Sequence, residues 1–481
     1  MEESIKHKTK VGAYWQFSNQ FLNYGMQFII GIVMARLLSP QDYGTAALPA
    51  VFFAISVIFI DGGFGTAMVR KEELTDQDLS TAFYYSTLVG FFFYVILFIA
   101  APWIAVFFDV PILSSLIRVS AISFLFAGFK TPQTILLNRR LDFKTPTIVT
   151  VISTLVMGVV GISTAYMGFG VWALVISNVV SGFLSLLLLW LFVRWIPKSG
   201  WSRESFNYLW GFGNKMIATL LIDKMYLNLA PFLIGKFYNP VQLGLFNRSQ
   251  SYAQLPVQQI VNLLHNVSYP VLSKMQDDTE MLGRSYRRML RLSTFIMFPI
   301  MILMAILAKP LILILITDKW IDCVPYLQLM CLAMMWYPIH SLNLALLLVK
   351  GRSDLFLKLE IIKAAIGLSI MAITLPFGII PFLFGLIANS LICLFVNTYY
   401  TGKMIKLGFS LQMLDIFPTL MLSLFMGMVS YVVLSFITNC FLQLIIGGIF
   451  GLLVYGIGSY FFKFPEINDV KYMIHVKRHG G

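Results

Sequence analysis

Residues 80–107 read STAFYYSTLVGFFFYVILFIAAPWIAVF and contain no Asp, Glu, Lys or Arg. A helix needs about 20 predominantly apolar residues to cross the hydrocarbon core of a bilayer. This stretch is therefore long and apolar enough to span a membrane. The whole chain has the same character, because 58% of its 481 residues are hydrophobic and only 12% are charged. A soluble domain is about a quarter charged, so we expect an all-α polytopic membrane protein.

Similar apolar stretches recur along the chain, separated by turn formers such as Ser39-Pro40 and Asn239-Pro240. We place fourteen membrane spans, which puts both ends of the chain on one side. Their expected ranges are 13–38, 42–61, 80–107, 112–137, 145–167, 171–193, 213–238, 241–269, 288–308, 322–349, 355–376, 380–401, 413–436 and 439–463.

Lys and Arg residues test this placement, because the cytoplasmic loops of membrane proteins collect them. With the N-terminus and every second loop assigned to the cytoplasm, 25 Lys and Arg lie inside and three lie outside. The sequence therefore predicts that both termini are cytoplasmic. The same rule accounts for the net charge of +13, so we expect no nucleic-acid partner. The first ten residues do not have the pattern of a cleavable signal peptide.

Nothing in the sequence predicts an enzyme or a metal centre. The longest internal segments outside the spans are 62–79, 194–212 and 270–287, which are too short for a soluble domain with an active site. The four cysteines form no Cys-x-x-Cys motif, and His265 and His340 have no second ligand at metal spacing. We therefore expect no catalytic residue, cofactor or metal.

The turn after the first span is similar to the turn after the seventh. Ser39-Pro40-Gln41-Asp42-Tyr43-Gly44 and Asn239-Pro240-Val241-Gln242-Leu243-Gly244 share Pro-x-x-x-Gly at an offset of 200 residues. Six spans separate the copies, so both have the same orientation, as in transporters built from two parallel lobes. We expect an N-terminal lobe at 1–200, a C-terminal lobe at 201–405, and two extra helices with a tail at 406–481.

Polar side chains follow one helical face in three of the spans. Amides and charges cannot face lipid cheaply, so such stripes line either a helix interface or a watery cavity. The presence of three such polar stripes favours a large polar cavity. They are Gln16, Gln20, Asn23 and Gln27 in the first span, Lys215, Thr219, Asp223 and Tyr226 with adjacent Lys224 and Asn228 in the seventh, and Asn247, Ser251, Gln254, Gln258, Asn262 and His265 with adjacent Arg248 and Gln259 in the eighth.

Three cations beside these stripes lie at different expected depths: Lys215, Lys224 and Arg248. An anionic head group that crosses the bilayer needs such partners, because its solvation cost in hydrocarbon is large. Two structural alternatives stay open. Lys215 can extend to the cytoplasmic surface, and Lys224 can pair with an acid on another helix, since Asp223 at i−1 is not expected to face it.

Five segments together resemble the Wzx-type lipid-linked oligosaccharide flippases of the multidrug/oligosaccharidyl-lipid/polysaccharide exporter superfamily, in particular the colanic acid and teichuronic acid exporters. The resemblance covers roughly residues 10–400, and the last two spans match by hydropathy only. The segments are Ala35-Arg36-Leu37-Leu38-Ser39-Pro40-Gln41-Asp42-Tyr43-Gly44, Asp61-Gly62-Gly63-Phe64-Gly65, Arg139-Arg140-Leu141-Asp142-Phe143-Lys144, Gly168-Phe169-Gly170-Val171-Trp172-Ala173-Leu174-Val175 and Ile234-Gly235-Lys236.

This resemblance implies a fold of two six-helix lobes in a V around a central cavity, as in the multidrug exporters, with two extra helices. The implied substrate is an undecaprenyl-diphosphate-linked glycan repeat unit, moved between the leaflets of a bacterial inner membrane by alternating access. The implied partners are that lipid-linked oligosaccharide, membrane lipid and other polysaccharide assembly proteins. Some related flippases use H⁺ or Na⁺ coupling, and no cluster of acids in this sequence identifies a coupling ion.

Two other functions stay open. A multidrug exporter that exchanges organic cations for H⁺ or Na⁺ needs net acid in its cavity, whereas the stripes carry three cations against one acid. A membrane assembly factor without transport predicts that the charges within the spans pair off and leave no aqueous cavity.

Overall fold

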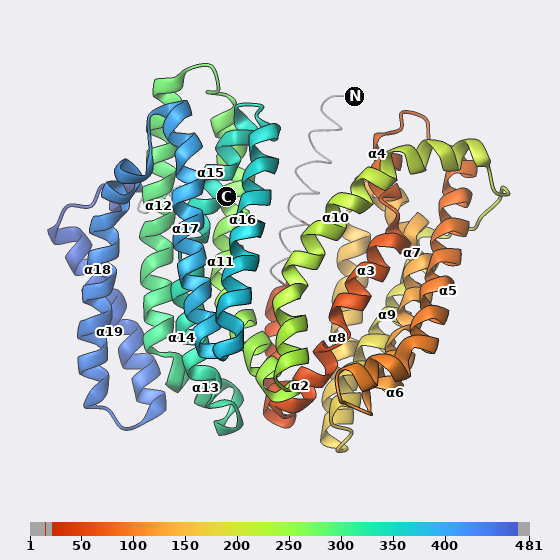
Figure 1. Cartoon of the computed structure of the whole chain (residues 1–481), viewed down its shortest axis with the longest axis horizontal. Coiled ribbons are helices and arrows are strands. Elements are labelled where there is room, and N and C mark those ends of the chain that lie inside the picture. The colour runs from red at the N-terminus through yellow and green to blue at the C-terminus, as the bar shows by residue number, and fades with distance from the viewer. Residues whose placement is uncertain (1–14, 16–21, 470–481) are drawn as a thin grey trace. The chain divides into compact units, whose positions relative to one another are not determined.

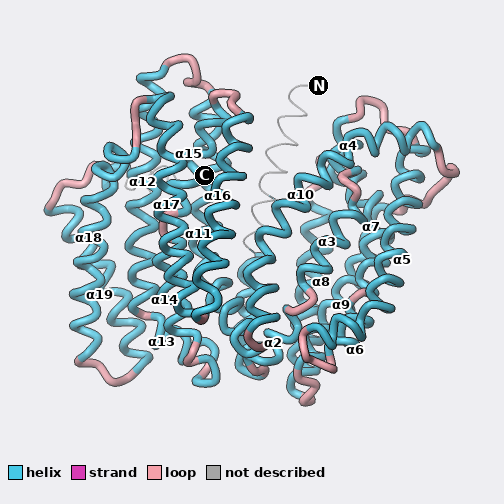
Figure 2. Tube along the Cα trace, in the orientation of Figure 1, coloured by secondary structure: helices cyan, strands magenta, loops and turns pink. Residues whose placement is uncertain are grey.

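The structure is a computed structural model, and it describes residue 15 and residues 22–469 of the chain (Figure 1). All regular elements in these ranges are helices joined by turns and short loops (Figure 2). The chain divides into two units, residues 1–244 and residues 245–481, and each is described by itself below.

Eleven helical stretches in the described part of the chain are long and apolar enough to cross a membrane. One of them, Asp76–Phe107, contains the charge-free stretch 80–107. The first expected span is represented by the shorter apolar helix Leu22–Leu37. The helices Pro240–Ser273 and Ser353–Thr374 are long enough but more polar. The all-helical membrane fold is therefore confirmed, and the count of fourteen spans stays a prediction.

Unit 1 begins, within the described residues, with the helix Leu22–Leu37. α8 packs against α9, α7 packs against both α5 and α9, and α10 lies along α3 (Figure 1). The numbered helices of this unit are α2 (Pro40–Ala47), α3 (Ala50–Asp61), α4 (Phe64–Arg70), α5 (Asp76–Phe107), α6 (Leu113–Ser120), α7 (Ile122–Arg139), α8 (Lys144–Tyr166), α9 (Val171–Val193) and α10 (Arg203–Phe237).

Two capping boxes fix helix starts in unit 1. Before α2, Ser39 Oγ accepts a hydrogen bond from the Asp42 N–H at 3.2 Å, and Asp42 Oδ2 accepts one from the Ser39 N–H at 2.9 Å. Thr75 and Asp78 make the same reciprocal pair before α5, at 3.2 and 3.0 Å. Lys71 adds an ion pair to Asp78 at 2.7 Å. These bonds satisfy N–H groups that a helix start leaves without partners.

The start of α11 (Pro240–Ser273) has the same local structure as the start of α2. Asn239 Oδ1 accepts a hydrogen bond from the Gln242 N–H at 2.9 Å, as Ser39 does from Asp42. A proline follows the capping residue in both turns, at a helix position where its missing N–H has no cost. The expected lobe boundaries and the superposition of the two halves stay predictions.

Two glycine-rich segments of unit 1 touch each other. Gly62 and Gly63, between α3 and α4, have φ angles of 62° and 67°, in the left-handed region that glycine adopts without strain. Gly213 of α10 packs so closely on this turn that a Cβ there would lie 2.2 Å from the Gly62 carbonyl oxygen. The glycines therefore allow α10 to approach the α3–α4 turn.

Unit 2 is built around α12, which contacts α14, α15, α17, α18 and α19. Its helices after α11 are α12 (Thr279–Ile306), α13 (Ala308–Ile316), η1 (Asp318–Trp320), α14 (Cys323–Met334), α15 (Tyr337–Val349), α16 (Ser353–Thr374), η2 (Leu375–Phe377), α17 (Ile379–Ile405), α18 (Phe409–Ser435) and α19 (Cys440–Phe461).

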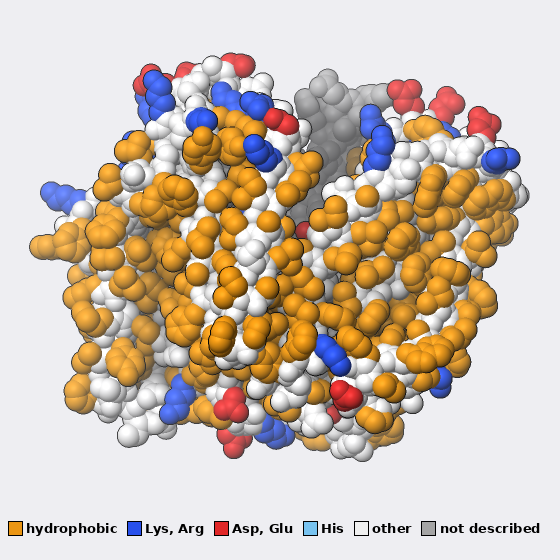
Figure 3. Space-filling view, in the orientation of Figure 1, with side chains coloured by type: hydrophobic (Ala, Val, Ile, Leu, Met, Phe, Trp, Pro, Cys, Tyr) orange, Lys and Arg blue, Asp and Glu red, His pale blue; other side chains and the backbone are white. Residues whose placement is uncertain are grey.

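The surface of each unit is apolar over its middle. Hydrophobic side chains cover the centre of the visible face of each unit, and charged side chains gather toward its two ends (Figure 3). Large side chains such as Trp103, Tyr166 and Phe436 are 68%, 75% and 83% exposed. Apolar surface of this extent is typical of a protein that lipid surrounds.

Candidate functional site

The polar stripe of the first span contacts α8. Gln27 Nε2 donates a hydrogen bond to Asn23 Oδ1 at 3.1 Å, and Thr154 Oγ1 donates to the same oxygen at 3.1 Å. Asn23 is half-buried, whereas Gln27 is exposed. Gln16 and Gln20 lie outside the described residues. Asn23 therefore takes part in a helix contact, and Gln27 presents an accessible amide.

The middle of α10 is exposed around its whole circumference. The buried residues of α10 stop at Ile217 and resume at Ile234, and every residue from 222 to 227 is exposed. Six consecutive residues cover all sides of a helix. The exposed set includes two charged side chains, Asp223 and Lys224. Charged groups cannot face lipid cheaply, so this accessible part of α10 is the candidate for the polar surface that the sequence predicts.

Lys224 and Asp223 form an ion pair on α10, with Lys224 Nζ 3.8 Å from Asp223 Oδ2. The expectation that Asp223 does not face Lys224 is therefore wrong. The reason is that the flexible four-carbon stem of lysine lets the ammonium reach the preceding residue. The two side chains are 46% and 57% exposed, and an ion pair this exposed contributes little to stability.

Lys215 is also exposed, two turns before Asp223 on α10. The Thr219 hydroxyl donates to the Lys215 carbonyl oxygen at 3.0 Å, so the polar side of the helix continues between them. The alternative that Lys215 extends to the membrane surface stays open.

The stripe on α11 is partly accessible. Asn247 and Gln254 are half-buried, and Gln258 is exposed. Farther along the helix, His265 Nε2 lies 3.2 Å from the Ser341 hydroxyl of α15. This stripe therefore combines a helix contact at one end with accessible amides before it.

Arg248, next to that stripe, lies against aromatic rings of unit 2. Its guanidinium carbon is 5.2 Å from the ring centre of Tyr252 and 6.0 Å from that of Trp320. Such cation–π contacts contribute about 0.5–2 kcal/mol, more where water is excluded. Lys224 belongs to unit 1 and is exposed, whereas Arg248 belongs to unit 2 and lies against aromatic rings. Their shared role in binding stays a prediction.

Unit 2 also contains a buried polar cluster that the sequence reasoning missed. Asn343 of α15 and Gln412 of α18 exchange amide hydrogen bonds of 3.1 Å in both directions. Thr401 of α17 donates to Asn343 Oδ1 at 2.6 Å, and Tyr286 of α12 donates to Gln412 Oε1 at 3.4 Å. The cluster joins four helices and is buried, so it holds the helices together. Two lone amides in apolar spans are the signal that could have found it.

Both ring nitrogens of His340 lie beside neutral groups in the described part of the chain. One ring nitrogen is 3.2 Å from the Ser390 hydroxyl and the other is 3.0 Å from the Asn397 amide nitrogen. In the described part of the chain, no group of three or more His, Cys, Asp or Glu residues could hold a metal ion.

Comparison with protein families identifies the chain. Residues 33–325 match the family model described as "polysaccharide biosynthesis protein", which is more than half of the sequence. The chain belongs to the polysaccharide biosynthesis protein family. The family expected from the five sequence segments is thereby confirmed.

Curated relatives of this family member have related names. It is 23% identical over 432 residues to the teichuronic acid biosynthesis protein TuaB of Bacillus subtilis, covering 89% of each chain. It is 22% identical over 366 residues to the lipopolysaccharide biosynthesis protein WzxC of Escherichia coli, covering 75% of this chain and 74% of that one. It is 21% identical over 319 residues to the succinoglycan biosynthesis transport protein ExoT of Rhizobium meliloti, covering 66% and 65%.

Solved structures with the same fold are transporters. The lipid II flippase MurJ in an inward closed conformation matches with a TM-score of 0.76 and 17% identity, covering 94% of this chain and 98% of that one. An inward-facing multidrug exporter of the MATE family matches with a TM-score of 0.60 and 15% identity, covering 79% and 95%. These similarities show that the chain shares its fold with these two proteins.

Proposed function

We propose that this member of the polysaccharide biosynthesis protein family is a flippase for undecaprenyl-diphosphate-linked oligosaccharide repeat units. It moves them from the cytoplasmic to the periplasmic leaflet of a bacterial inner membrane by alternating access. The relatives named for teichuronic acid, lipopolysaccharide and succinoglycan biosynthesis support this class of substrate. The observation that carries the proposal is the exposed, charged middle of α10 in an otherwise apolar membrane protein.

In this proposal the diphosphate binds to cations near the polar stripes. Lys224 is the principal one, because its ammonium is exposed and its only ion pair in the described residues is a loose contact with Asp223. Lys215 and Arg248 are cations at other depths along the path. The amides that would bind glycan hydroxyl groups are Gln20, Asn23, Gln27, Asn247, Gln254 and Gln258. The prenyl tail remains in lipid.

The structural alternative for Lys224 makes a different prediction. If Lys224 held the fold together through a buried ion pair, removal of its charge would leave a buried carboxylate and destabilise the protein by several kcal/mol. The partner in the structure is Asp223, which is 57% exposed. Loss of the Lys224 charge therefore leaves a hydrated carboxylate, and the protein should fold normally.

The test uses the purified full-length chain in liposomes with a fluorescent undecaprenyl-diphosphate-linked oligosaccharide. A membrane-impermeant quencher reports how fast the labelled lipid changes leaflet. We expect Lys224→Gln to slow the movement about tenfold or more, because a hydrogen bond to a charged group contributes about 1.5–3 kcal/mol. Lys198→Gln, an exposed lysine in the segment before α10, is the matched control and should move the lipid at the normal rate.

Three outcomes would contradict the proposal. If the Lys224→Gln variant moves the labelled lipid at the normal rate, Lys224 does not take part in transport. Transport of an organic cation such as ethidium, without movement of the labelled lipid, identifies a multidrug exporter. A well-folded protein that moves neither compound favours an assembly factor.

A further inference from the structure

Four arginines gather on one face of α12, away from the polar stripes. Arg284, Arg287, Arg288 and Arg291 follow the spacing i, i+3, i+4 and i+7, which places them on the same side of a helix. Like charges at these spacings repel each other. The arrangement therefore needs nearby anions.

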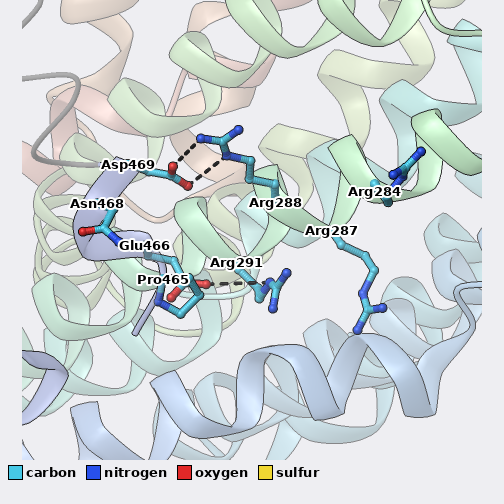
Figure 4. A pocket seen from close by; sticks show the side chains of 8 residues that line it. All are labelled: Arg284, Arg287, Arg288, Arg291, Pro465, Glu466, Asn468 and Asp469. Atoms are coloured by element: carbon cyan, nitrogen blue, oxygen red, sulfur yellow. Dashed lines mark hydrogen bonds and ion pairs between the residues drawn. The ribbon is translucent and has the colours of Figure 1, made fainter. Parts of the chain in front are cut away.

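Carboxylates from two other segments supply part of this negative charge. Asp469, after α19, accepts two hydrogen bonds from Arg288, one of them at 3.0 Å, and Glu466 lies 3.7 Å from Arg291. Arg287 points away from Arg288 and Arg291 (Figure 4). It forms a bidentate pair with Asp415 of α18 at 2.7 and 2.6 Å.

These residues line a cavity of about 490 Å³. Its walls carry all four arginines together with Glu466 and Asp469, and Pro465 and Asn468 complete it. Asp415 outside the lining neutralises Arg287. The other three guanidinium groups share the lining with two carboxylates, Glu466 and Asp469, so an excess of one positive charge remains.

Two of the arginines have donor capacity that their contacts do not use. Arg291 Nε is buried and lies 3.7 Å from Glu466 Oε1, too far for a hydrogen bond, and neither this nitrogen nor Glu466 Oε2 makes one within the described residues. Arg284 is 73% exposed, and among the described residues its one ion pair is a 3.8 Å contact with Glu280, which is itself 84% exposed. A planar guanidinium is well suited to bind phosphate oxygens with two parallel hydrogen bonds. The unused donors therefore favour a phosphate-bearing anion.

The cavity lies beside a surface that is suited to lipid. Tyr460, Phe461 and Phe462, at the end of α19 and just before the lining residue Pro465, are 73%, 78% and 67% exposed. Exposed aromatic side chains at the end of a membrane span are typical of the interface between hydrocarbon and head groups. A phosphate that reaches the arginines at this level can belong to a lipid whose chains lie along α19.

We infer that this arginine cavity binds the phosphate of an anionic phospholipid head group, on the side that the charge distribution predicts to be cytoplasmic. Basic pockets between membrane helices on that side bind such head groups in other proteins. In this inference the lipid phosphate competes with the Asp469 carboxylate for the hydrogen-bond donors of Arg288. The site is separate from the residues assigned to oligosaccharide transport, so each proposal can fail without the other.

The test measures lipid binding to the purified full-length chain by native mass spectrometry. Phosphatidylglycerol is the anionic probe, phosphatidylcholine is the zwitterionic control, and inorganic diphosphate is the soluble competitor. We expect the chain to retain phosphatidylglycerol in preference to phosphatidylcholine. The double variant Arg284→Gln with Arg291→Gln should bind phosphatidylglycerol about thirtyfold more weakly, in line with the contribution of two cations at a membrane surface.

Two further variants separate site binding from general effects. Arg194→Gln with Arg352→Gln removes the same number of charges from the predicted cytoplasmic side and should leave binding unchanged. Asp469→Asn removes the competing carboxylate and should strengthen phosphatidylglycerol binding. A loss of folding cannot produce this increase, so the Asp469 variant tests the site even if the arginine variant is unstable.

Three results would overturn the inference. The first is equal phosphatidylglycerol binding by the wild-type chain and the Arg284/Arg291 variant. The second is an equal loss of binding in the Arg194/Arg352 control. The third is displacement of the lipid by an equal concentration of inorganic diphosphate, which would assign the site to a soluble anion.

Discussion

Gly44 and Gly244 make reciprocal close contacts in unit 1. A Cβ on Gly44 would lie 1.6 Å from the Pro240 carbonyl oxygen, and a Cβ on Gly244 would lie 2.0 Å from the Pro40 carbonyl oxygen. Gly44 therefore packs on Pro240, the first residue of α11, and Gly244 packs on Pro40, the first residue of α2. Contacts exchanged between equivalent positions are what a local two-fold axis produces. The shared Pro-x-x-x-Gly pattern thus has a packing reason in both copies.

We predict that Gly44→Ala and Gly244→Ala each destabilise the protein. The added methyl group would overlap a backbone carbonyl, which cannot rotate away, and overpacking of this kind costs about 1–3 kcal/mol or more. Thermal unfolding of the purified variants, together with their abundance in the membrane, measures the effect.

Gly25→Ala is the control for this prediction, because a Cβ at Gly25 would have no atom of the described residues within 4 Å other than those of its own helical turn. That variant should be as stable as the wild-type chain or slightly more stable, since alanine favours a helix over glycine. If Gly44→Ala unfolds at the same temperature as Gly25→Ala, the close contact is not needed for stability.

A second prediction concerns the buried amides of unit 2. Gln412→Leu removes the acceptor of the Tyr286 hydroxyl. It also removes two hydrogen bonds of the Asn343 amide, which keeps its bonds to Thr401 and to the Ile339 carbonyl. Because a buried polar group without a hydrogen bond costs about 1–3 kcal/mol, the unfolding temperature should fall.

The double variant Gln412→Leu with Asn343→Leu should lose less stability than the sum of the two single losses. Each single change leaves the other amide with fewer hydrogen bonds, whereas the double change removes both amides. Strictly additive losses would show that the two amides do not depend on each other.

Local features of this fold could be predicted from the sequence. The charge-free residues 80–107 lie in α5, and the Ser39 and Asn239 turns both start helices with a capping hydrogen bond. These features depend on residues within a few positions of each other. Hydropathy and turn chemistry report such short-range interactions directly.

Contacts between distant residues could not be predicted in this way. Asn343 and Gln412 are 69 positions apart, and Gly62 meets Gly213 from a different helix. No local pattern encodes which buried amide or glycine will meet another, because the contact depends on how the helices pack. For the same reason the sequence identified Arg248 as a cation but not its packing against Trp320.

A third prediction concerns the orientation of the chain in the membrane. The 25 Lys and Arg assigned to one side predict that the loop before α12 is cytoplasmic and the loop between α18 and α19 is not. In a Cys440→Ser background, Asp277→Cys should not react with an impermeant thiol reagent outside intact cells, whereas Thr438→Cys should react. The three remaining native cysteines are buried, so they give a low background. The reverse labelling pattern would contradict the orientation.

The last prediction distinguishes the two cations next to the polar stripes. Arg248 makes cation–π contacts with Tyr252 and with the buried ring of Trp320. Arg248→Gln should lose this contribution and lower the unfolding temperature. Lys224 has only an exposed partner, so Lys224→Gln should unfold at the wild-type temperature.

Arg248→Lys is the informative third variant. It keeps the charge but replaces the planar guanidinium, which stacks on aromatic rings better than an ammonium does. If Arg248 is mainly structural, Arg248→Lys should be destabilised but should still move lipid at a temperature where it is folded. If its charge also binds the diphosphate, Arg248→Gln should move lipid more slowly than Arg248→Lys at that temperature. Equal unfolding temperatures for Arg248→Gln and Lys224→Gln would contradict the assignment of different roles, because only one of these side chains packs against rings.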